Sequence, residues 1–266
     1  MKQKQSALSN TRIAIFFFIL LAFFVAISIL FKLILVVKAG QFDDARRFNL
    51  TISNNKDSRA ISLSPQTQKI AVLKLDKNIK SEKAGKFLEI PIDGYINSNI
   101  LNTNQKLSSL FLQAIINYEN LQTNLTIIDL LKIAFFAKTV PESSINIKTI
   151  PQSLSATDID KIVGRLVSDE LIEKDNQTIQ IINATDVGGL GNRLARLITN
   201  IGGDVIIVAT SDKSQKESTI SYIDKKTYTV KRLNKILGYE IIQAGNSVIA
   251  DVTITIGEDK ANSSPF

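Results

Sequence analysis

The sequence predicts a mixed α/β (α+β) protein with an N-terminal transmembrane helix, a central α/β region and a C-terminal two-layer α/β module containing a β-α-β unit. An uncharged apolar run from Ile13 to Phe31 predicts the first part, and short β-branched runs within 46–79 predict strands in the second. After residue 178, strand-like runs alternate with amphipathic helical segments, which predicts the third. The 266 residues are 44 % hydrophobic and 21 % charged, which is typical of folded chains.

The apolar run is long enough for a membrane helix. At about 1.5 Å per residue it spans roughly 28 Å, close to the thickness of a bilayer core. Lys32 follows and the apolar character resumes to Val37, so Lys32 can extend to the far interface. A buried core helix and a cleaved signal peptide, with Ala39-Gly40 as a weak cleavage site, are the alternatives. Aromatic residues on every face disfavour the first, and the length of the run disfavours the second.

Charge sets the expected orientation of this helix. The net charge is +7, and its main source is the first forty residues, which contain no acid but contain Lys2, Lys4, Arg12, Lys32 and Lys38. Because positive residues precede the span, we expect the N-terminus to be cytoplasmic and the remainder extracytoplasmic at the cell membrane. The run 125–137 is too short and too charged to span, so we expect a single pass, with the lipid bilayer as a partner.

Composition excludes several classes of site. The chain has no Cys and no His, so a disulfide framework, a thiolate nucleophile, an iron–sulfur or cysteine zinc site and a Ser-His-Asp triad are all excluded. We expect no cofactor in the favoured interpretation. The part of the chain after the anchor carries no basic stripe, so we expect no nucleic-acid partner.

The central region, 41–175, is predicted to begin with strands and continue with helices. Polar residues 78–86 predict a loop, and Pro91 excludes a helix around it. Thr126 with Asp129 three residues later, and Thr157 with Asp160, are patterns typical of helix N-caps. The predicted strands are 47–53, 59–64, 69–75 and 145–150, and the predicted helices are 104–118, 127–140 and a single helix from Thr157 through 172.

The C-terminal module, 176–258, has the clearest pattern and leaves 259–266 as a tail. Strands are expected at 178–183 and 204–210, the second of them buried, with an amphipathic helix between them that ends at Gly202-Gly203. Such a β-α-β unit makes the two strands parallel. Further strands are expected at 218–223, 239–242 and 250–257, with a helix from Tyr228 to Leu237 ended by Gly238.

Two groups of residues in the C-terminal module are candidates for ligand binding. Gly188, Gly189 and Gly191 lie between a strand and a helix, where backbone N–H groups can hold a phosphate, although a tight entry turn is the favoured interpretation. Arg193 and Arg196 follow on the helix and could contact a sugar phosphate or an acidic polymer, although a solvated helix face is the simpler interpretation.

A third group of candidates lies just beyond the predicted membrane helix. Asp43, Asp44, Arg46 and Arg47 could hold a lipid pyrophosphate together with a divalent ion. The favoured interpretation is a charged linker at the membrane interface.

Residues 182–212, INATDVGGLGNRLARLITNIGGDVIIVATSD, resemble the opening of the LytR C-terminal domain: a strand ending in Asn-x-Thr/Ser, a Gly-x-x-Gly-Leu turn, a helix, and a second strand. Later segments match the remaining elements of that domain in order, so the resemblance covers about 179–259. Residues 48–96 resemble a degraded LytR/CpsA/Psr domain, which transfers anionic polymers from a lipid pyrophosphate carrier to peptidoglycan.

The departures from the LytR/CpsA/Psr pattern imply lost catalysis. The family's Arg falls on Lys77 and its Asp on Asn78, whereas a later family signature appears as Ile90-Pro91-Ile92-Asp93-Gly94-Tyr95. Lys does not replace a bidentate Arg, and an amide does not supply a carboxylate to magnesium. The central region is therefore expected to be a non-catalytic scaffold, with Lys77 and Asp93 as further candidate ligand-binding residues.

These observations predict a single-pass, extracytoplasmic cell-envelope protein that binds or organises cell-wall polymer without catalysis, with peptidoglycan or an anionic wall polymer as the partner. Two alternatives remain open. The first is a phosphotransferase that uses Lys77, Arg46 or Arg47 with Asp43 or Asp93, and in that case Mg²⁺. The second is a structural, partner-binding subunit of an envelope complex.

Overall fold

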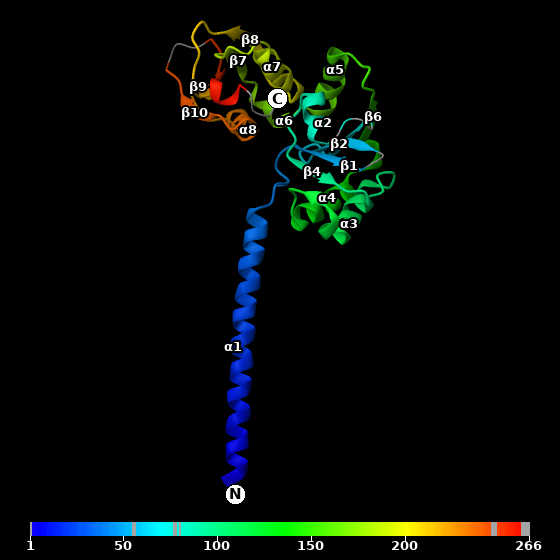
Figure 1. Cartoon of the computed structure of the whole chain (residues 1–266), viewed down its shortest axis with the longest axis vertical. Coiled ribbons are helices and arrows are strands. Elements are labelled where there is room, and N and C mark those ends of the chain that lie inside the picture. The colour runs from blue at the N-terminus through cyan, green and yellow to red at the C-terminus, as the bar shows by residue number, and fades with distance from the viewer. Residues whose placement is uncertain (1, 55–56, 77–78, 80, 246–248, 262–266) are drawn as a thin grey trace.

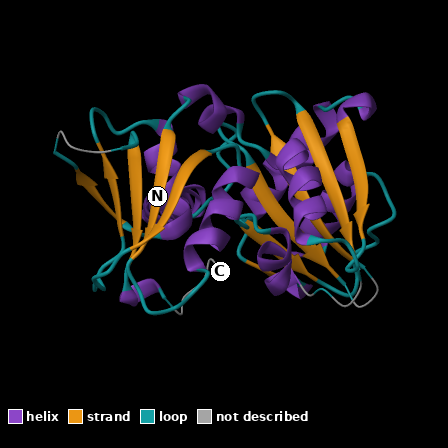
Figure 2. Cartoon of the chain, turned by 90° about the horizontal axis from the view of Figure 1, so that it is seen from above, coloured by secondary structure: helices purple, strands orange, loops and turns teal. Residues whose placement is uncertain are grey.

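A single long helix carries a two-part folded body. The computed structural model describes residues 2–54, 57–76, 79, 81–245 and 249–261. Helix α1 (Lys2–Lys38) projects from the body as an isolated rod, and the two sheets of the body lie side by side (Figures 1 and 2). Within the described residues, α1 is the helix that is long and apolar enough to cross a membrane, over Ile13–Lys38. The predicted fold class is confirmed.

The first sheet forms the middle layer of a helix–sheet–helix arrangement. Its order is β5-β4-β1-β2-β3-β6; β1, β2 and β3 form an antiparallel meander, β4 pairs with β1 in parallel, and β6 pairs with β3 in parallel. The strands are β1 (Phe48–Ser53), β2 (Ser58–Ser64), β3 (Lys69–Leu75), β4 (Gly94–Asn97), β5 (Gln122–Thr123) and β6 (Ile145–Ile150).

Helices cover both faces of this sheet. One face packs on α3 (Leu107–Ile116) and α4 (Ile127–Thr139) through a core that includes Leu50 and Phe111. The other face packs on α2 (Ser81–Leu88) and α5 (Ala156–Val167) through Leu73 and Val163. Single 3₁₀ turns follow α3 and α4, at η1 (Tyr118–Asn120) and η2 (Glu142–Ser144).

Two predictions in the central region are wrong. The segment 78–86, predicted as a loop, contributes most of α2, because Ala84 and Leu88 are four residues apart and both pack into the core. The helix predicted to be capped at Thr157 begins earlier, with Ser155 as its N-cap. It also ends at Val167, and Asp169 caps a separate helix, α6 (Glu170–Asp175).

The second sheet has the order β10-β9-β11-β7-β8 and carries its two longer helices on one face. Strands β7 and β8 are parallel and are joined through α7, so the predicted β-α-β unit is confirmed. Its elements are β7 (Thr178–Asn183), α7 (Leu190–Asn200), β8 (Asp204–Thr210), β9 (Thr219–Tyr222), α8 (Tyr228–Leu237), β10 (Glu240–Gln243), β11 (Val252–Ile256) and η3 (Glu258–Lys260).

Strand β8 corrects a third prediction. Its run of apolar residues is typical of a strand covered on both faces, and we expected it to be buried. The strand instead lies at the edge of the sheet, and its exposure alternates along its length, with Ile206 44 % exposed. An apolar run specifies a strand, but its place in the sheet depends on which other strands pair with it.

Candidate functional site

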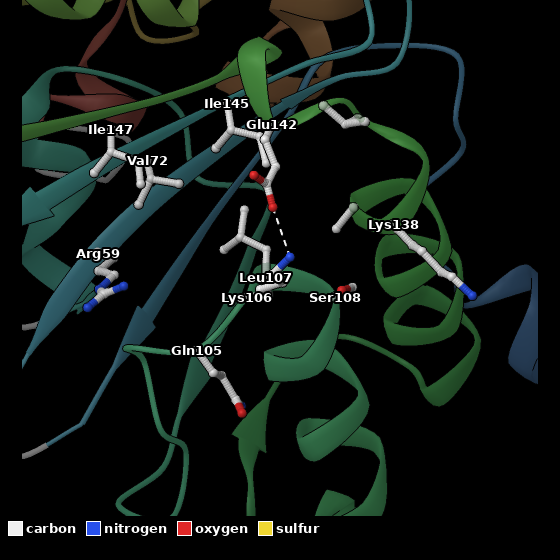
Figure 3. Close-up of a pocket in the computed structure, with 12 residues that line it drawn as sticks. Arg59, Val72, Gln105, Lys106, Leu107, Ser108, Lys138, Glu142, Ile145 and Ile147 are labelled. Carbon is white, nitrogen blue, oxygen red and sulfur yellow. Dashed lines mark hydrogen bonds and ion pairs between the residues drawn. The ribbon is translucent and has the colours of Figure 1, made fainter.

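An open cleft lies between the first sheet and the ends of α3 and α4. Its volume is about 530 Å³, and its apolar lining includes Val72 and Leu107 (Figure 3). The ion pair between Lys106 and Glu142 spans it, with Nζ and Oε1 2.8 Å apart. This pair is exposed, and each partner favours the charged form of the other: the pKa of Lys106 is raised and that of Glu142 is lowered. The cleft therefore combines an apolar floor with paired charges.

A second hollow, of about 690 Å³, shares Arg59 with this cleft and has a mixed polar and apolar lining. Arg59 lines both spaces and is held rigidly: its guanidinium donates to Asp57, to the carbonyl of Thr103 and to Asn104. The hollow is rich in side-chain amides, which both donate and accept hydrogen bonds as sugar hydroxyls do. Its amide-bearing residues are Asn54, Asn99, Asn102 and Asn104. We call the two spaces together the Arg59 groove.

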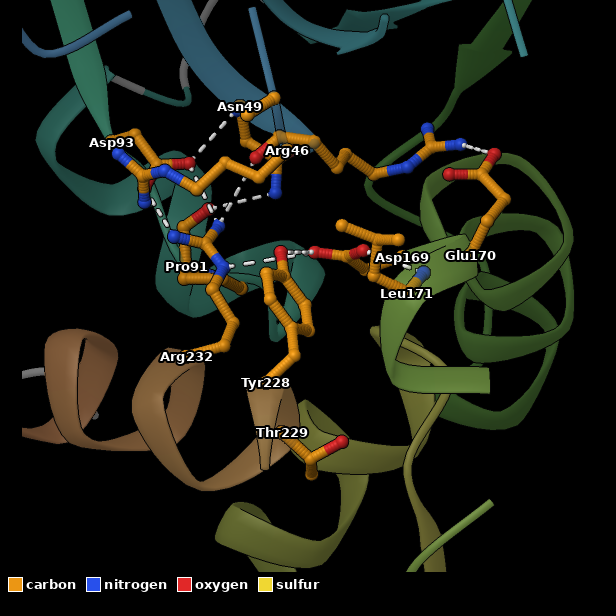
Figure 4. Close-up of polar contacts among 12 residues, drawn as sticks. Arg46, Asn49, Pro91, Asp93, Asp169, Glu170, Leu171, Tyr228, Thr229 and Arg232 are labelled. Carbon is orange, nitrogen blue, oxygen red and sulfur yellow. Dashed lines mark hydrogen bonds and ion pairs between the residues drawn. The ribbon is translucent and has the colours of Figure 1, made fainter. Parts of the chain in front are cut away.

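The predicted residues Arg46 and Asp93 are brought together elsewhere, between the two sheets (Figure 4), and the carbonyl of Arg47 accepts from Arg232 of the same cluster. Arg232 of α8, which the sequence analysis missed, donates from Nη1 to Asp93 Oδ1 at 2.9 Å and from Nη2 to Oδ2 at 3.0 Å. Asp93 Oδ2 also accepts from the backbone N–H of Asn49 at 3.0 Å. Asp93 thus joins the first sheet to α8 through a bidentate, buried ion pair.

The two neighbouring arginines are also engaged with acceptors of the chain itself. Arg46 donates from Nε to Asp43 at 2.6 Å, and its Nη1 lies 3.7 Å from Asp93. Arg47 donates from Nη2 to Glu170 at 2.6 Å and from Nη1 to Ser62 and to the carbonyl of Leu166. Both side chains are buried. The segment that contains Arg46 and Arg47, predicted as a charged linker, therefore lies in the interface between the sheets.

Asp169 and Tyr228 extend this cluster. The Tyr228 hydroxyl donates to Asp169 Oδ2 at 2.7 Å, and Arg232 Nε lies 3.8 Å from the same oxygen. Burial raises the pKa of Asp169, although the hydrogen bond from Tyr228 and the nearby arginines oppose that shift. Burial and the adjacent carboxylate raise the pKa of Tyr228 as well, which keeps its hydroxyl a hydrogen-bond donor.

A second ionic group joins α7 to the central region. Arg193 donates to Glu89 at 3.1 Å, and Arg196 forms a bidentate pair with Asp160 at 2.7 and 3.0 Å. Asn200 donates to the carbonyl of Glu89 and to Asp160. The two predicted arginines are therefore partly exposed and form ion pairs with carboxylates of α5 and of the segment after α2.

The glycine turn begins α7, the helix that carries Arg193 and Arg196. Gly189 has a φ of 85° and is the N-cap of α7, whereas a Cβ at Gly191 would lie 3.0 Å from Val208. Gly188 has open space around it. A left-handed entry turn and close helix–strand packing account for Gly189 and Gly191. Lys77 lies outside the described residues. Among the described residues, no group of three or more Asp or Glu side chains is arranged to hold a metal ion.

Acid should weaken the interface between the two parts of the body. Although burial opposes it, Arg196 and Asn200 lower the pKa of Asp160, and Arg47 likewise lowers that of Glu170 against burial. A carboxyl whose folded pKa is depressed contributes stability above its unfolded pKa and loses it as the pH falls, here below about 4. We expect Asp160→Asn to reduce the fall in thermal unfolding temperature between neutral and acidic buffer. The exposed Asp212→Asn is the charge-matched control, and an unchanged pH profile in Asp160→Asn would contradict the assignment.

Comparison with known proteins gives one family match. Residues 176–259 match the model of the family described as LytR cell envelope-related transcriptional attenuator. A search of the curated proteins finds no match.

Solved structures give distant similarities. The transcriptional regulator yvhJ from Bacillus subtilis is 13 % identical with a TM-score of 0.37, and B. subtilis TagV is 10 % identical with a TM-score of 0.33. In both cases the match covers 46 % of this chain and 95 % of the other. The Lin1025 protein from Listeria innocua is 11 % identical with a TM-score of 0.31, over 46 % of this chain and 96 % of that one. Similarity at this level does not establish a shared function.

Proposed function

We propose, because residues 176–259 form a LytR C-terminal domain, that this chain is a single-pass cell-envelope protein. Its body lies outside the membrane and binds cell-wall polymer without catalysis. The family's description places it at the cell envelope, and α1 supplies a helix of sufficient length and apolarity to be the anchor. The positive residues that precede the span favour an extracytoplasmic body.

The engagement of the arginines is the observation that carries the non-catalytic part of the proposal. A transferase acting on a lipid pyrophosphate needs cationic groups that are available to phosphate oxygens. Arg46, Arg47 and Arg232 instead direct their hydrogen bonds to carboxylates and carbonyls of the chain and, for Arg47, also to the Ser62 hydroxyl. Arg196 does the same with Asp160. These residues hold the two parts of the body together, which favours a scaffold over the phosphotransferase alternative.

The Arg59 groove is the place we propose for the polymer. Its amide-lined hollow suits the hydroxyl groups of sugars, and its apolar cleft suits the C–H faces of sugar rings. Lys106 supplies a cation at the cleft, and Glu142 competes with any anionic group of the polymer for that cation. The two partners of this ion pair therefore have opposite roles in binding.

The test is retention of the full chain, in nanodiscs, on insoluble cell-wall sacculi with and without their anionic glycopolymer. We expect Lys106→Ala to lower the retained fraction and Glu142→Gln to raise it, because the second change frees the ammonium group. Both residues are exposed, so neither change should affect folding. Lys213→Ala, an exposed lysine of the second part, is the control. If the unaltered chain is retained on neither kind of sacculi, the proposal is overturned. If Lys106→Ala and Glu142→Gln give equal retained fractions, the cleft is excluded as the binding site.

A further inference from the structure

The outer face of the α3–α4 pair is apolar, and no described element covers it. The inner faces of the two helices pack against the sheet in the core, through Leu110, Phe111 and Ala114 of α3 and Leu130, Ile133 and Ala134 of α4. The opposite faces expose Ile116, which is 83 % exposed, and Phe135, which is 70 % exposed. The same face includes Leu112, Ile127 and Leu131. Residues 127, 131 and 135 follow one another at intervals of four, so they form a stripe along α4.

The position of this face relative to α1 is fixed by short contacts. Helix α1 ends at Lys38, and the backbone N–H groups of Gln41 and Phe42 both donate to Asp129 Oδ1, at 2.9 and 3.0 Å. Asp129 lies in the first turn of α4. A Cβ at Gly40 would lie 3.2 Å from the same oxygen, so the chain passes directly over the start of α4. Phe42 is buried in the core beside Phe48 and Phe136.

These contacts place the α3–α4 pair at the depth of the membrane surface. Figure 1 shows α3 and α4 as the lowest part of the body, on the side from which α1 projects and beside its last turns. The apolar part of α1, Ile13–Lys38, is about 39 Å long at 1.5 Å per residue, longer than a hydrocarbon core of roughly 30 Å. The end of α1, and with it the start of α4, therefore falls in the headgroup region.

The charges of the pair suit the same location. Within α4 the exposed charged residues are Lys132 and Lys138, whereas its one acid, Asp129, is buried. Helix α3 has no charged residue. Apolar side chains flanked by lysines are typical of helices that lie in the membrane interface, where the lysines meet lipid phosphates.

We propose that the outer face of α3 and α4 inserts into the lipid headgroup and acyl boundary of the membrane that α1 spans, so that the body is held against the bilayer and not merely tethered to it. The proposal rests on the membrane anchoring in the proposed function. It gives the body a fixed orientation, with the α2–α5 face of the first sheet and the second sheet directed away from the lipid.

The experiment uses the absence of Trp from the chain. Single tryptophans are introduced into the full chain in nanodiscs of phosphatidylcholine and phosphatidylglycerol, with and without bromine on the acyl chains. Phe135→Trp on α4 and Ile116→Trp on α3 report on the proposed face, and both sites are exposed enough to accept the change. Phe24→Trp within α1 reports on anchoring itself. Ile206→Trp, an exposed apolar site on β8, is the matched control.

We expect brominated lipid to quench the emission of the Phe24→Trp, Phe135→Trp and Ile116→Trp variants and to leave that of Ile206→Trp unchanged. Quenching in Phe24→Trp without quenching in the α3 and α4 variants would overturn the interfacial insertion and leave the anchor intact. A blue-shifted but unquenched emission from Phe135→Trp would mean that a second copy or another protein covers the face, which also overturns it. Absence of quenching in Phe24→Trp would instead refute the membrane anchoring on which both proposals depend.

Discussion

Replacing Arg232 by methionine is expected to lower the free energy of unfolding by about 3–5 kcal/mol, because it leaves the buried carboxylate of Asp93 without its bidentate partner. The side chains of both residues are less than a tenth exposed, so water cannot replace the lost hydrogen bonds. The change also removes a donor from the carbonyl of Arg47 and a cation from Asp169. Chemical denaturation of the full chain in micelles, followed by far-ultraviolet circular dichroism, measures the effect.

The double variant Arg232→Met with Asp93→Asn separates an uncompensated charge from general loss of packing. Removing both charges should recover part of the stability lost in Arg232→Met, because position 93 no longer carries an uncompensated charge. Arg232→Lys should be intermediate, since an ammonium group keeps the charge but cannot donate in the bidentate geometry. If the double variant is as unstable as the sum of the single variants, the ion pair is not the origin of the effect.

Local sequence patterns predicted some helix ends correctly where capping residues determine them. Thr126 and Asp129 form the capping box at the start of α4, with both reciprocal hydrogen bonds present. Gly238 ends α8 with a φ of 67°, a left-handed conformation that glycine adopts without strain. In α2 the local composition was misleading, because Ala84 and Leu88 connect an otherwise polar segment to the core.

The candidate site depended on contacts that no local pattern encodes. Arg46, Arg47 and Asp93 were identified as candidates, but Arg232, which links them to the second sheet, lies 139 residues from Asp93. One available signal was the spacing of Tyr228 and Arg232, which are four residues apart and therefore share a face of α8.

The arginines of α7 illustrate the same limit. Periodicity assigned Arg193 to the polar side of the helix, and part of that side packs against the central region. Arg193 and its partner Glu89 are 104 residues apart, so the pairing depends on how the two parts of the body pack.

Asp129→Ala is expected to have the second large effect, because one carboxylate accepts four hydrogen bonds and joins the segment after α1 to the start of α4. Its Oδ1 accepts from the backbone of Gln41 and Phe42, and its Oδ2 accepts from the backbone and hydroxyl of Thr126. Loss of an acceptor for a buried N–H costs about 1–3 kcal/mol. The reciprocal half of the capping box, in which Asp129 accepts from the backbone N–H of Thr126, is lost as well, so we expect a decrease of about 4 kcal/mol in the free energy of unfolding.

Asp129→Ala should also allow the body to take a wider range of orientations relative to α1. Because the chain has no Cys, a pair of spin labels can be attached at Ile29→Cys on α1 and Lys161→Cys on α5, both exposed positions. The distance distribution between the labels should be narrow in the unaltered chain and broad in Asp129→Ala. Thr126→Ala is the matched control, because it removes the cap, at a cost of about 1 kcal/mol, and keeps the acceptor for Gln41 and Phe42. A broad distribution in Thr126→Ala would mean that the start of α4, and not the carboxylate of Asp129, fixes the anchor to the body.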